Sequence, residues 1–266
     1  MKETDMVQTI LKTRDLSIRF GGVTAVDGVN IEAAENELIG LIGPNGAGKT
    51  TLFNLLTGVY SPSEGEVLLF DGQQLANVNR QSPAKRARLG VARTFQNIRL
   101  FGSRTVLENV MIAMNSSTQA HVFSSLFRLP SFYKNEEQLK NEARKLLSIF
   151  DMLEVQDTLA TNLPYGQQRR LEIVRALATK PKILFLDEPA AGMNPQETAD
   201  LTRLIKQVQQ EFKMTIILIE HDMNLVMAVS ERLYVLEYGK LLASGTPLEI
   251  QQNADVIRAY LGENNE

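Results

Sequence analysis

A short glycine-rich segment, GPNGAGKT at residues 43–50, constrains the fold of this chain more than any other feature. It fits the pattern G-x-x-x-x-G-K-[ST] of a phosphate-binding loop, or P-loop. The apolar run at 38–42 predicts a buried strand before the loop, and 49–56 predicts a helix after it, with Gly58 as its C-cap. The motif requires this order of strand, loop and helix, so we expect an α/β fold. A chance glycine-rich turn would not account for the flanking pattern.

The residues of this loop predict several kinds of phosphate contact. Glycines allow backbone N–H groups to surround phosphate oxygens, and the N-terminus of the following helix adds partial positive charge. We expect Lys49 to reach the β- and γ-phosphates of a nucleotide and the Thr50 hydroxyl to ligate Mg²⁺. The candidate nucleotide-binding residues of the loop are Gly43, Pro44, Asn45, Gly46, Ala47, Gly48, Lys49, Thr50 and Thr51.

Two carboxylates follow a second apolar run, at 183–186. A buried strand here would deliver Asp187 and Glu188 at its C-terminal end, where α/β folds bind their ligands. We predict that Asp187 holds Mg²⁺, directly or through water, and that Glu188 polarises the attacking water as general base. Alone, the pair could equally be solvated acids at a strand end, but downstream of a P-loop it indicates nucleotide hydrolysis.

Two polar residues close further strand-like runs. His221 follows the run at 215–219, where an imidazole can bind the γ-phosphate and hold the attacking water. Gln96 follows the run at 91–95, and its amide could ligate Mg²⁺ or water when ATP is bound. Neither signal is specific alone, because a single histidine or glutamine is usually structural.

Composition excludes several classes of function. The chain of 266 residues has a net charge of −3 and no cysteine, which argues against a nucleic-acid partner, disulfides and thiolate metal sites. No apolar stretch approaches the ~18 residues of a membrane span, and the charged N-terminus has no signal-peptide core. We therefore expect a cytoplasmic protein, for which a partner must supply any membrane spans.

Helical periodicity interrupts the alternation of strands and helices. We predict a nucleotide-binding core at 7–96 and 167–262, an inserted helical subdomain at 97–166, and flexible termini at 1–6 and 263–266.

Two segments, one before the helical subdomain and one within it, carry more specific expectations. Residues 82–95 predict a short helix and then a buried strand that ends near Phe95. The moderately aromatic stretch 116–135 predicts a loop or short-helix insertion whose apolar side chains pack on their own subdomain. A role of these side chains in binding a partner is the alternative.

Together these motifs resemble those of the ATP-binding-cassette (ABC) ATPases, over roughly residues 10 to 262. The resemblance implies a RecA-like core, an N-terminal antiparallel β subdomain and an inserted α-helical subdomain. It also implies that two cassettes pack head to tail and enclose ATP between the P-loop of one and the signature motif of the other. The family's roles fall on Phe20 (adenine stacking), Gln96 (Q-loop), Asp187 and Glu188 (Walker B), His221 (switch histidine), and Tyr165, Gly166 and Gln167 (signature motif).

Two positions depart from the family pattern. Where the signature has serine and then glycine, this chain has Pro164 and then Tyr165, and proline offers neither a hydroxyl nor an N–H. A lost donor could cost ~1–3 kcal/mol, so we expect the composite site that uses this signature to be weaker and its paired site stronger. In the D-loop, Asn194 replaces the usual aspartate, which puts coupling between the two sites in doubt.

A closer similarity is to the larger ATP-binding subunit of bacterial branched-chain amino acid importers, at 165–173, 187–195, 219–223 and 255–262. It implies ATP hydrolysis with Mg²⁺ that powers uptake of leucine, isoleucine and valine at the cytoplasmic face of the inner membrane. The partners that it implies are a second cassette in a hetero- or homodimer, two permease subunits and, indirectly, a periplasmic amino-acid-binding protein.

Other functions stay open on the sequence alone. Related cassettes serve urea or short amides, or lipopolysaccharide export; Pro164, Tyr165 and the stretch 116–135 argue against the export cassette. A weakly hydrolysing regulatory cassette agrees with Pro164 but not with an intact Glu188 and His221. A translation or DNA-repair ATPase would commonly carry two cassettes or a coiled coil, and this chain has one P-loop and no sustained heptads. We expect residues 96–101 to meet the membrane partner.

Overall fold

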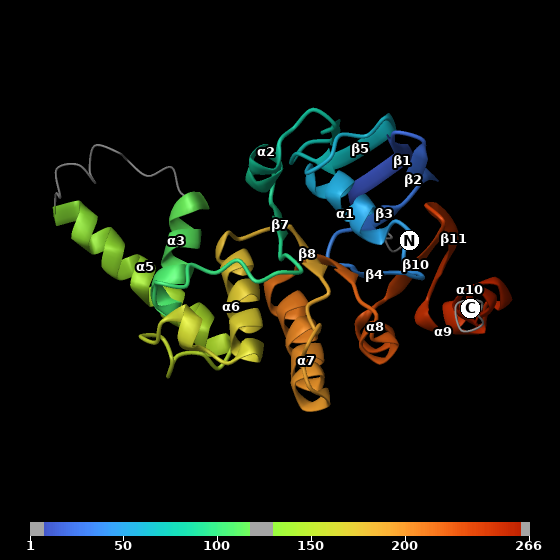
Figure 1. The fold of residues 1–266 in the computed structure, drawn as a ribbon. Helices are drawn as coiled ribbons and strands as arrows, with labels where there is room; N and C mark the ends of the chain where they lie inside the picture. Colours follow the sequence, from blue (N-terminus) through green and yellow to red (C-terminus); the bar gives the residue numbers. More distant parts are fainter. Residues whose placement is uncertain (1–7, 118–129, 262–266) are drawn as a thin grey trace, which may run out of the picture.

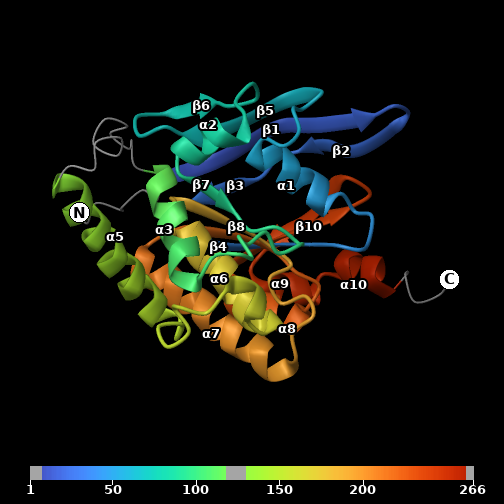
Figure 2. The ribbon, with the colours of Figure 1, turned by 60° about the vertical axis from the view of Figure 1, so that its left-hand side comes forward.

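The computed structural model describes residues 8–117 and 130–261, which form two sheets with helices between and around them (Figure 1). Within these residues no helix is both long enough and apolar enough to cross a membrane. Figure 2 shows the antiparallel sheet lying over α1 and the larger sheet, whose other face is covered by helices.

The first sheet has five strands in the order β2-β1-β5-β6, with β3 also paired to β1. Its strands are β1 (Thr9–Phe20), β2 (Val23–Val29), β3 (Glu32–Ala34), β5 (Glu64–Phe70) and β6 (Leu75–Asn77). All pairings are antiparallel. Asn30 and Ile31 separate β2 from β3. The Asn30 side chain accepts the N–H of Asp15 at 2.8 Å, where β1 has a left-handed φ of 45°.

The second sheet has six strands in the order β11-β10-β4-β9-β8-β7. They are β4 (Leu38–Ile42), β7 (Val91–Arg93), β8 (Ile183–Asp187), β9 (Thr215–Ile219), β10 (Arg232–Glu237) and β11 (Lys240–Gly245). Only β11 is antiparallel to its neighbour. β4, β8 and β9 are buried along their whole length, which explains their continuous apolar runs. The expected strand before Phe95 ends earlier, at Arg93.

Two hydrophobic cores lie on opposite faces of this second sheet. Alternate residues divide between them, so that Ile217 packs in the core shared with the antiparallel sheet and Ile216 packs in the core shared with the helices. The helix α1 (Lys49–Thr57) lies between the two sheets and ends, as predicted, at Gly58 with a φ of 82°. The P-loop is thereby held between two packed layers.

The end of α1 is fixed by an arginine that sequence reasoning did not identify. Arg86 lies in α2 (Pro83–Arg88) and is fully buried. Its guanidinium donates to the carbonyl oxygens of Leu55 and Leu56 at 2.6 and 2.7 Å, and to that of Val78 at 2.9 Å. Burial lowers the pKa of Arg86 to about 10.

The elements between β7 and β8 within the described residues are helices joined by loops, in line with the helical periodicity of the sequence (Figure 1). The helices outside the sheets are α3 (Val106–Ser117), α5 (Pro130–Ile149), the 3-10 turn η1 (Ala160–Asn162), α6 (Tyr165–Ala178), α7 (Pro195–Phe212), α8 (Met223–Val229), α9 (Pro247–Gln252) and α10 (Ala254–Leu261). The loop or short-helix insertion expected at 116–135 differs from the structure at both ends, which belong to long helices. Ser117 ends α3, and Pro130 begins α5 because proline suits the first turn of a helix. Residues 118–129 lie outside the described residues.

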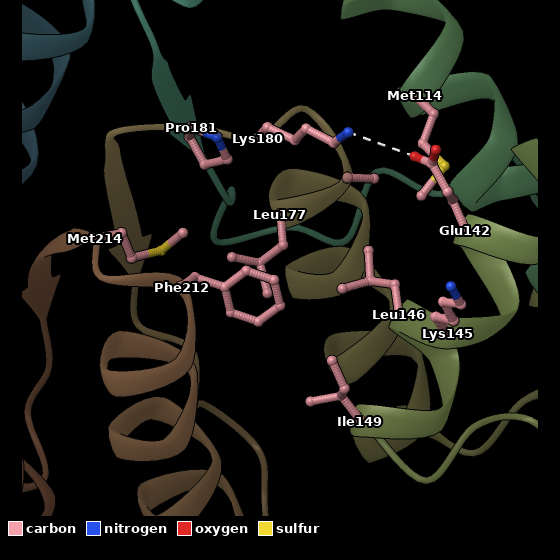
Figure 3. Close-up of a pocket in the computed structure, with 11 residues that line it drawn as sticks. Met114, Glu142, Lys145, Leu146, Ile149, Leu177, Lys180, Pro181, Phe212 and Met214 are labelled. Atoms are coloured by element: carbon pink, nitrogen blue, oxygen red, sulfur yellow. Dashed lines mark hydrogen bonds and ion pairs between the residues drawn. The ribbon is translucent and has the colours of Figure 1, made fainter.

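A cavity of about 360 Å³ lies where α5 and α6 meet the end of α7 (Figure 3). Its lining is mainly apolar, with an ion pair of 3.4 Å between Lys180 and Glu142 at its edge. No residue that the sequence indicates for nucleotide chemistry lines it. The P-loop and this cavity therefore lie in different parts of the fold.

Candidate active site

The loop between β4 and α1 borders a cavity of about 470 Å³. The cavity is lined by P-loop residues 45–51, by Glu188 and His221, by the start of β2 at 23–25 and by the turn at 238–239. The structure thus brings the carboxylate and the imidazole that the sequence indicated to the P-loop.

Two P-loop glycines are required by close backbone packing. A Cβ on Gly43 would lie 2.1 Å from the carbonyl oxygen of Leu236, and a Cβ on Gly48 would lie 2.5 Å from that of Ala25. Both residues also have positive φ angles, of 148° and 96°. Gly46, with a φ of 76°, has open space around it and needs glycine for its backbone angle alone. The strands around the loop therefore fix its path.

Lys49 is buried and turns back into the loop. Its ammonium donates to the carbonyl oxygens of Gly43 at 2.6 Å and Pro44 at 2.8 Å. Thr50 and Thr51 follow in the first turn of α1 and line the same cavity. A bound phosphate would therefore compete with two carbonyls for a lysine that is already held at the loop.

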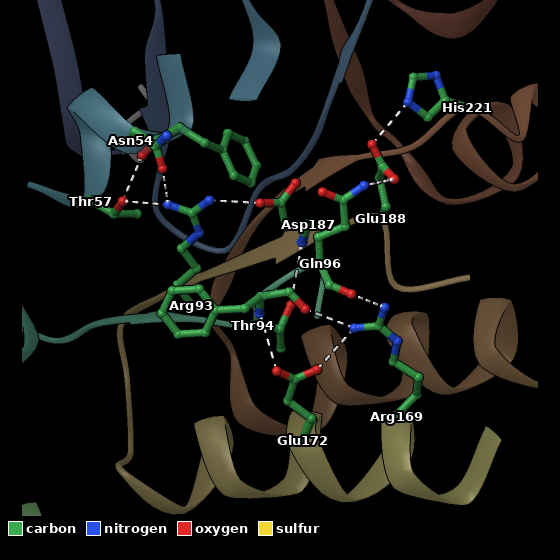
Figure 4. Close-up of polar contacts among 12 residues, drawn as sticks. Asn54, Thr57, Arg93, Thr94, Gln96, Arg169, Glu172, Asp187, Glu188 and His221 are labelled. Carbon is green, nitrogen blue, oxygen red and sulfur yellow. Dashed lines mark hydrogen bonds and ion pairs between the residues drawn. The ribbon is translucent and has the colours of Figure 1, made fainter. Parts of the chain in front are cut away.

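Two of the predicted residues, Gln96 and His221, converge on the carboxylate of a third, Glu188 (Figure 4). The Gln96 amide donates to Glu188 Oε2 at 3.0 Å, and His221 Nε2 lies 2.9 Å from Glu188 Oε1. Glu188 takes a left-handed φ of 48°, and its N–H donates to the Ile219 carbonyl at 2.9 Å. This backbone bond joins the end of β8 to the end of β9 and brings Glu188 beside His221.

Asp187 faces a different partner. Its Oδ2 accepts a hydrogen bond of 2.6 Å from Arg93, whose guanidinium also donates to Asn54 at 2.7 Å and Thr57 at 3.0 Å on α1. Sequence reasoning missed Arg93. The signal that could have found it is a charged residue inside an apolar run, directly before the Gln96 segment.

The signature helix holds the backbone of the Gln96 segment. Arg169 in α6 donates to the carbonyl oxygen of Phe95 at 2.7 Å and also to that of Gln96. Glu172, one turn further on, accepts the Phe95 N–H at 3.2 Å and pairs with Arg169 at 3.1 Å. Burial raises the pKa of Glu172, against the opposing effects of the Phe95 N–H and Arg169. These contacts connect the signature segment to a predicted catalytic residue.

A second buried acid fixes the segment that carries His221. Glu220 accepts the N–H groups of Ala190 at 2.6 Å and of His221 at 3.1 Å. Burial raises the pKa of Glu220, and these N–H groups act in the opposite direction. The acid therefore ties the segment after β9 to the one after β8. Sequence reasoning missed it because an acid before a histidine has no pattern of its own.

The signature residues lie apart from the cavity of their own chain. Pro164 is the N-cap of α6 and caps it with no side-chain hydrogen bond. Tyr165 is half-exposed; its hydroxyl accepts from Arg169 at 3.2 Å, and its ring lies beside Gly192. The first turn of this helix, which includes Gly166 and Gln167, is not stabilised by a side-chain cap.

Two further positions have local roles that the structure makes plain. Asn194 is the N-cap of α7 and forms a reciprocal capping box with Glu197, at 3.0 and 2.9 Å. Asn194 therefore caps α7 at the D-loop position, where the family usually has an aspartate, and it does so with a neutral side chain. Phe20 is half-exposed at the end of β1 and packs edge-on against Tyr60, with ring centroids 5.3 Å apart. Neither residue lines the P-loop cavity.

The oxygen donors at the site suit Mg²⁺. Thr50 offers a hydroxyl, Asp187 a carboxylate and Gln96 an amide, which are the ligand types that magnesium prefers alongside phosphate oxygens and water. The described residues contain no cluster of three or more His, Cys, Asp or Glu side chains that could hold a metal alone. The donor set therefore fits a metal that arrives with a nucleotide.

Comparison with known proteins settles the family. A family model for ABC transporters matches residues 26–191, and one for branched-chain amino acid ATP-binding cassette transporters matches 240–265. The chain belongs to the ABC transporter family. It is 49% identical, over 97% of its length and 100% of the relative, to the high-affinity branched-chain amino acid transport ATP-binding protein LivG of Escherichia coli strain K12. It is 46% identical, with the same coverage, to the corresponding protein BraF of Pseudomonas aeruginosa.

A solved structure supports the fold independently. The ADP conformation of MJ1267, an ATP-binding cassette of an ABC transporter, superposes with a TM-score of 0.81 at 30% identity, and the match covers 96% of this chain and 99% of that one. The ABC ATPase fold expected from the sequence is therefore confirmed. The chain is an ABC transporter ATPase of the branched-chain amino acid type.

Proposed function

We propose that this chain binds ATP and Mg²⁺ and hydrolyses ATP to power the uptake of leucine, isoleucine and valine across a bacterial inner membrane. The observation that carries the hydrolytic part is the convergence of Gln96 and His221 on Glu188 beside the P-loop cavity. The solute class is supported by sequence identity of 49% and 46%, over 97% of the chain, to two relatives named for branched-chain amino acid transport.

The residues have separate roles in this proposal. P-loop residues 43–51 bind the phosphates, and the Glu188 carboxylate accepts a proton from the attacking water. Gln96 and His221, each within hydrogen-bond distance of Glu188, orient that water. Thr50, Asp187 and Gln96 would hold Mg²⁺, which supplies charge neutralisation at the β- and γ-phosphates.

The proposal includes a second cassette, from another subunit or another copy. Head-to-tail packing would place the first turn of α6, with Tyr165, Gly166 and Gln167, against the nucleotide held by the partner's P-loop. These residues do not line the cavity of their own chain, and they lie at the N-terminus of α6. Helix N-termini bind phosphate because their N–H groups and the helix dipole favour negative charge. Phe20, exposed at the end of β1, would stack on adenine.

We propose that the helical segment 97–166 meets two permease subunits at the cytoplasmic face of the membrane. Its beginning exposes an aromatic and basic patch: Phe101 is 46% exposed, and the Arg175 guanidinium lies 4.8 Å from its ring centroid. Arg99 lies 4.1 Å from the Phe95 ring, next to Gln96. A periplasmic amino-acid-binding protein would act through the permeases without contacting this chain.

The test is radiolabelled leucine uptake in cells whose only copy of this gene carries Glu188→Gln. The change keeps the shape of the side chain and removes the base, so we expect ATPase turnover of the purified complex to fall about 10²–10⁴-fold and uptake to be lost. Glu211→Gln, an exposed acid on α7, is the matched control and should leave uptake intact. Normal leucine uptake with Glu188→Gln would overturn the proposal.

One observation favours a second candidate, a cassette that binds ATP and hydrolyses it weakly. Pro164 leaves the N-terminus of α6 with no side-chain cap and removes the signature serine's donor. A single-turnover assay on the purified pair of cassettes separates the two functions. Hydrolysis of one ATP per site supports an active ATPase, and hydrolysis at one site only supports the weak cassette.

A further inference from the structure

Arg93 bridges the two elements that carry the expected magnesium ligands. Its Nη2 donates to Asp187 Oδ2 at 2.6 Å, and its Nη1 donates to Asn54 Oδ1 at 2.7 Å and Thr57 Oγ1 at 3.0 Å (Figure 4). Asp187 ends β8, whereas the other two residues lie on α1, whose first turn includes Thr50. One guanidinium therefore sets how the metal-binding strand sits against the P-loop helix.

The bridge is buried and directional. The Arg93 side chain is 9% exposed and that of Asp187 is 3% exposed. The Thr57 hydroxyl donates its own hydrogen to the Phe53 carbonyl at 2.7 Å, so its oxygen is left to accept from Arg93. In such a dry position the pair is held strongly and in one geometry, because water does not compete with it.

The contact occupies only one side of the carboxylate. Arg93 binds Oδ2 of Asp187, and among the described residues no hydrogen bond reaches Oδ1. The backbone is fixed as well, since the Asp187 N–H donates to Thr94 Oγ1 at 3.3 Å. Both the position and the rotation of the carboxylate are thereby set, with one oxygen left for another ligand.

We propose that Arg93 is a positioning residue that orients Asp187 toward the magnesium ion of bound Mg·ATP; this rests on the function proposed above. Arg93 balances the charge of the buried carboxylate before the metal arrives, holds Oδ2 and leaves Oδ1 for the metal or its water. Residues behind metal ligands act in this way, by fixing the orientation of the ligand.

The test compares nucleotide affinity with and without metal. Binding of a fluorescent ATP analogue is titrated in excess Mg²⁺ and again in excess EDTA, for the wild-type chain, Arg93→Met and Arg93→Lys. We expect Arg93→Met to weaken binding about 10–100-fold in Mg²⁺ and hardly at all in EDTA. Arg93→Lys keeps the charge but cannot bridge both elements, so its loss should be intermediate.

Two further variants separate orientation from general stability. Arg86→Met removes another buried arginine that binds α1 but no acid, and it should lower Tm without changing the Mg²⁺ effect. Asn54→Ala removes one anchor of Arg93 and keeps its pair with Asp187, so it gives a milder test if Arg93→Met does not fold.

Three outcomes are distinguishable. Selective loss in Mg²⁺ supports the proposal. Equal loss in Mg²⁺ and EDTA, or no loss with either Arg93 variant and Asn54→Ala, overturns it. If the wild-type chain itself binds the analogue equally with and without Mg²⁺, the metal assignment in the proposed function fails instead.

Discussion

Replacement of Arg86 by methionine should destabilise the fold from a position that no nucleotide contacts. Arg86 is fully buried and has three carbonyl partners, two at the end of α1 and one at Val78. Each carbonyl left unsatisfied costs about 1–3 kcal/mol, and relief of the buried charge offsets part of that loss. Burial lowers the pKa of Arg86 to about 10, because a charged group is costly to remove from water. We expect a net loss of about 3 kcal/mol.

Thermal unfolding measures this loss. For a chain of this size about 3 kcal/mol corresponds to a fall in Tm of roughly 6–12 °C. Arg88→Met is the matched control, because Arg88 lies on the same helix and is exposed, and it should change stability by less than about 0.5 kcal/mol. Equal Tm values for the two variants would refute the reasoning, because they would show that the three carbonyls find other partners at no cost.

Three further changes test other contacts. Burial raises the pKa of Glu220, so the stability that it contributes is present at pH values below 4.5, its ordinary pKa, and is lost as pH rises through the folded-state pKa. Glu220→Gln, which can still accept the Ala190 N–H, should flatten that fall, and an unchanged slope of Tm against pH would contradict this. Phe101→Ala should lower leucine uptake while ATP binding to the purified chain stays intact; unchanged uptake would show that this patch is not the coupling surface. Pro164→Ser restores a donor worth about 1–3 kcal/mol and should raise ATP turnover about 5- to 150-fold if the donor acts fully in the transition state. Turnover is measured beside Tm because a serine N-cap also stabilises α6; unchanged turnover with a higher Tm would assign the residue to capping alone.

The sequence predicted those parts of the site whose signal is local. The strand, the P-loop and the helix follow one another directly in the chain, so the local sequence pattern predicted both their structure and their phosphate-binding role. The acids at 187–188 and the histidine at 221 each end an apolar strand, and parallel strands bring their carboxyl ends to one edge. The sequence thus indicated that these residues share one edge of the sheet, but the order of the strands is known only from the structure.

The parts that sequence reasoning missed depend on contacts between distant segments. Arg93 and Asp187 are separated by 94 residues, and Arg169 and Phe95 by 74. Nothing in the local pattern says which buried charge meets which carbonyl or carboxylate. The boundaries at 116–135 failed for a related reason: aromatic content and irregular polarity hid the start of α5, which packing against α3 and α6 stabilises.

Asp187 and Glu188 show how the fold gives neighbouring carboxylates different environments. Successive side chains in a strand point to opposite faces, and the left-handed φ of 48° at Glu188 turns the chain further at that point. Asp187 therefore lies against Arg93 and α1, and is 2% exposed. Glu188 instead faces Gln96 and His221 beside the P-loop cavity. Asp187 is held in one orientation by a guanidinium, an arrangement that suits a metal ligand, whereas Glu188 lies between an amide and an imidazole at the cavity where the attacking water would lie. The division of labour proposed for the two acids follows from these partners and not from their order in the chain.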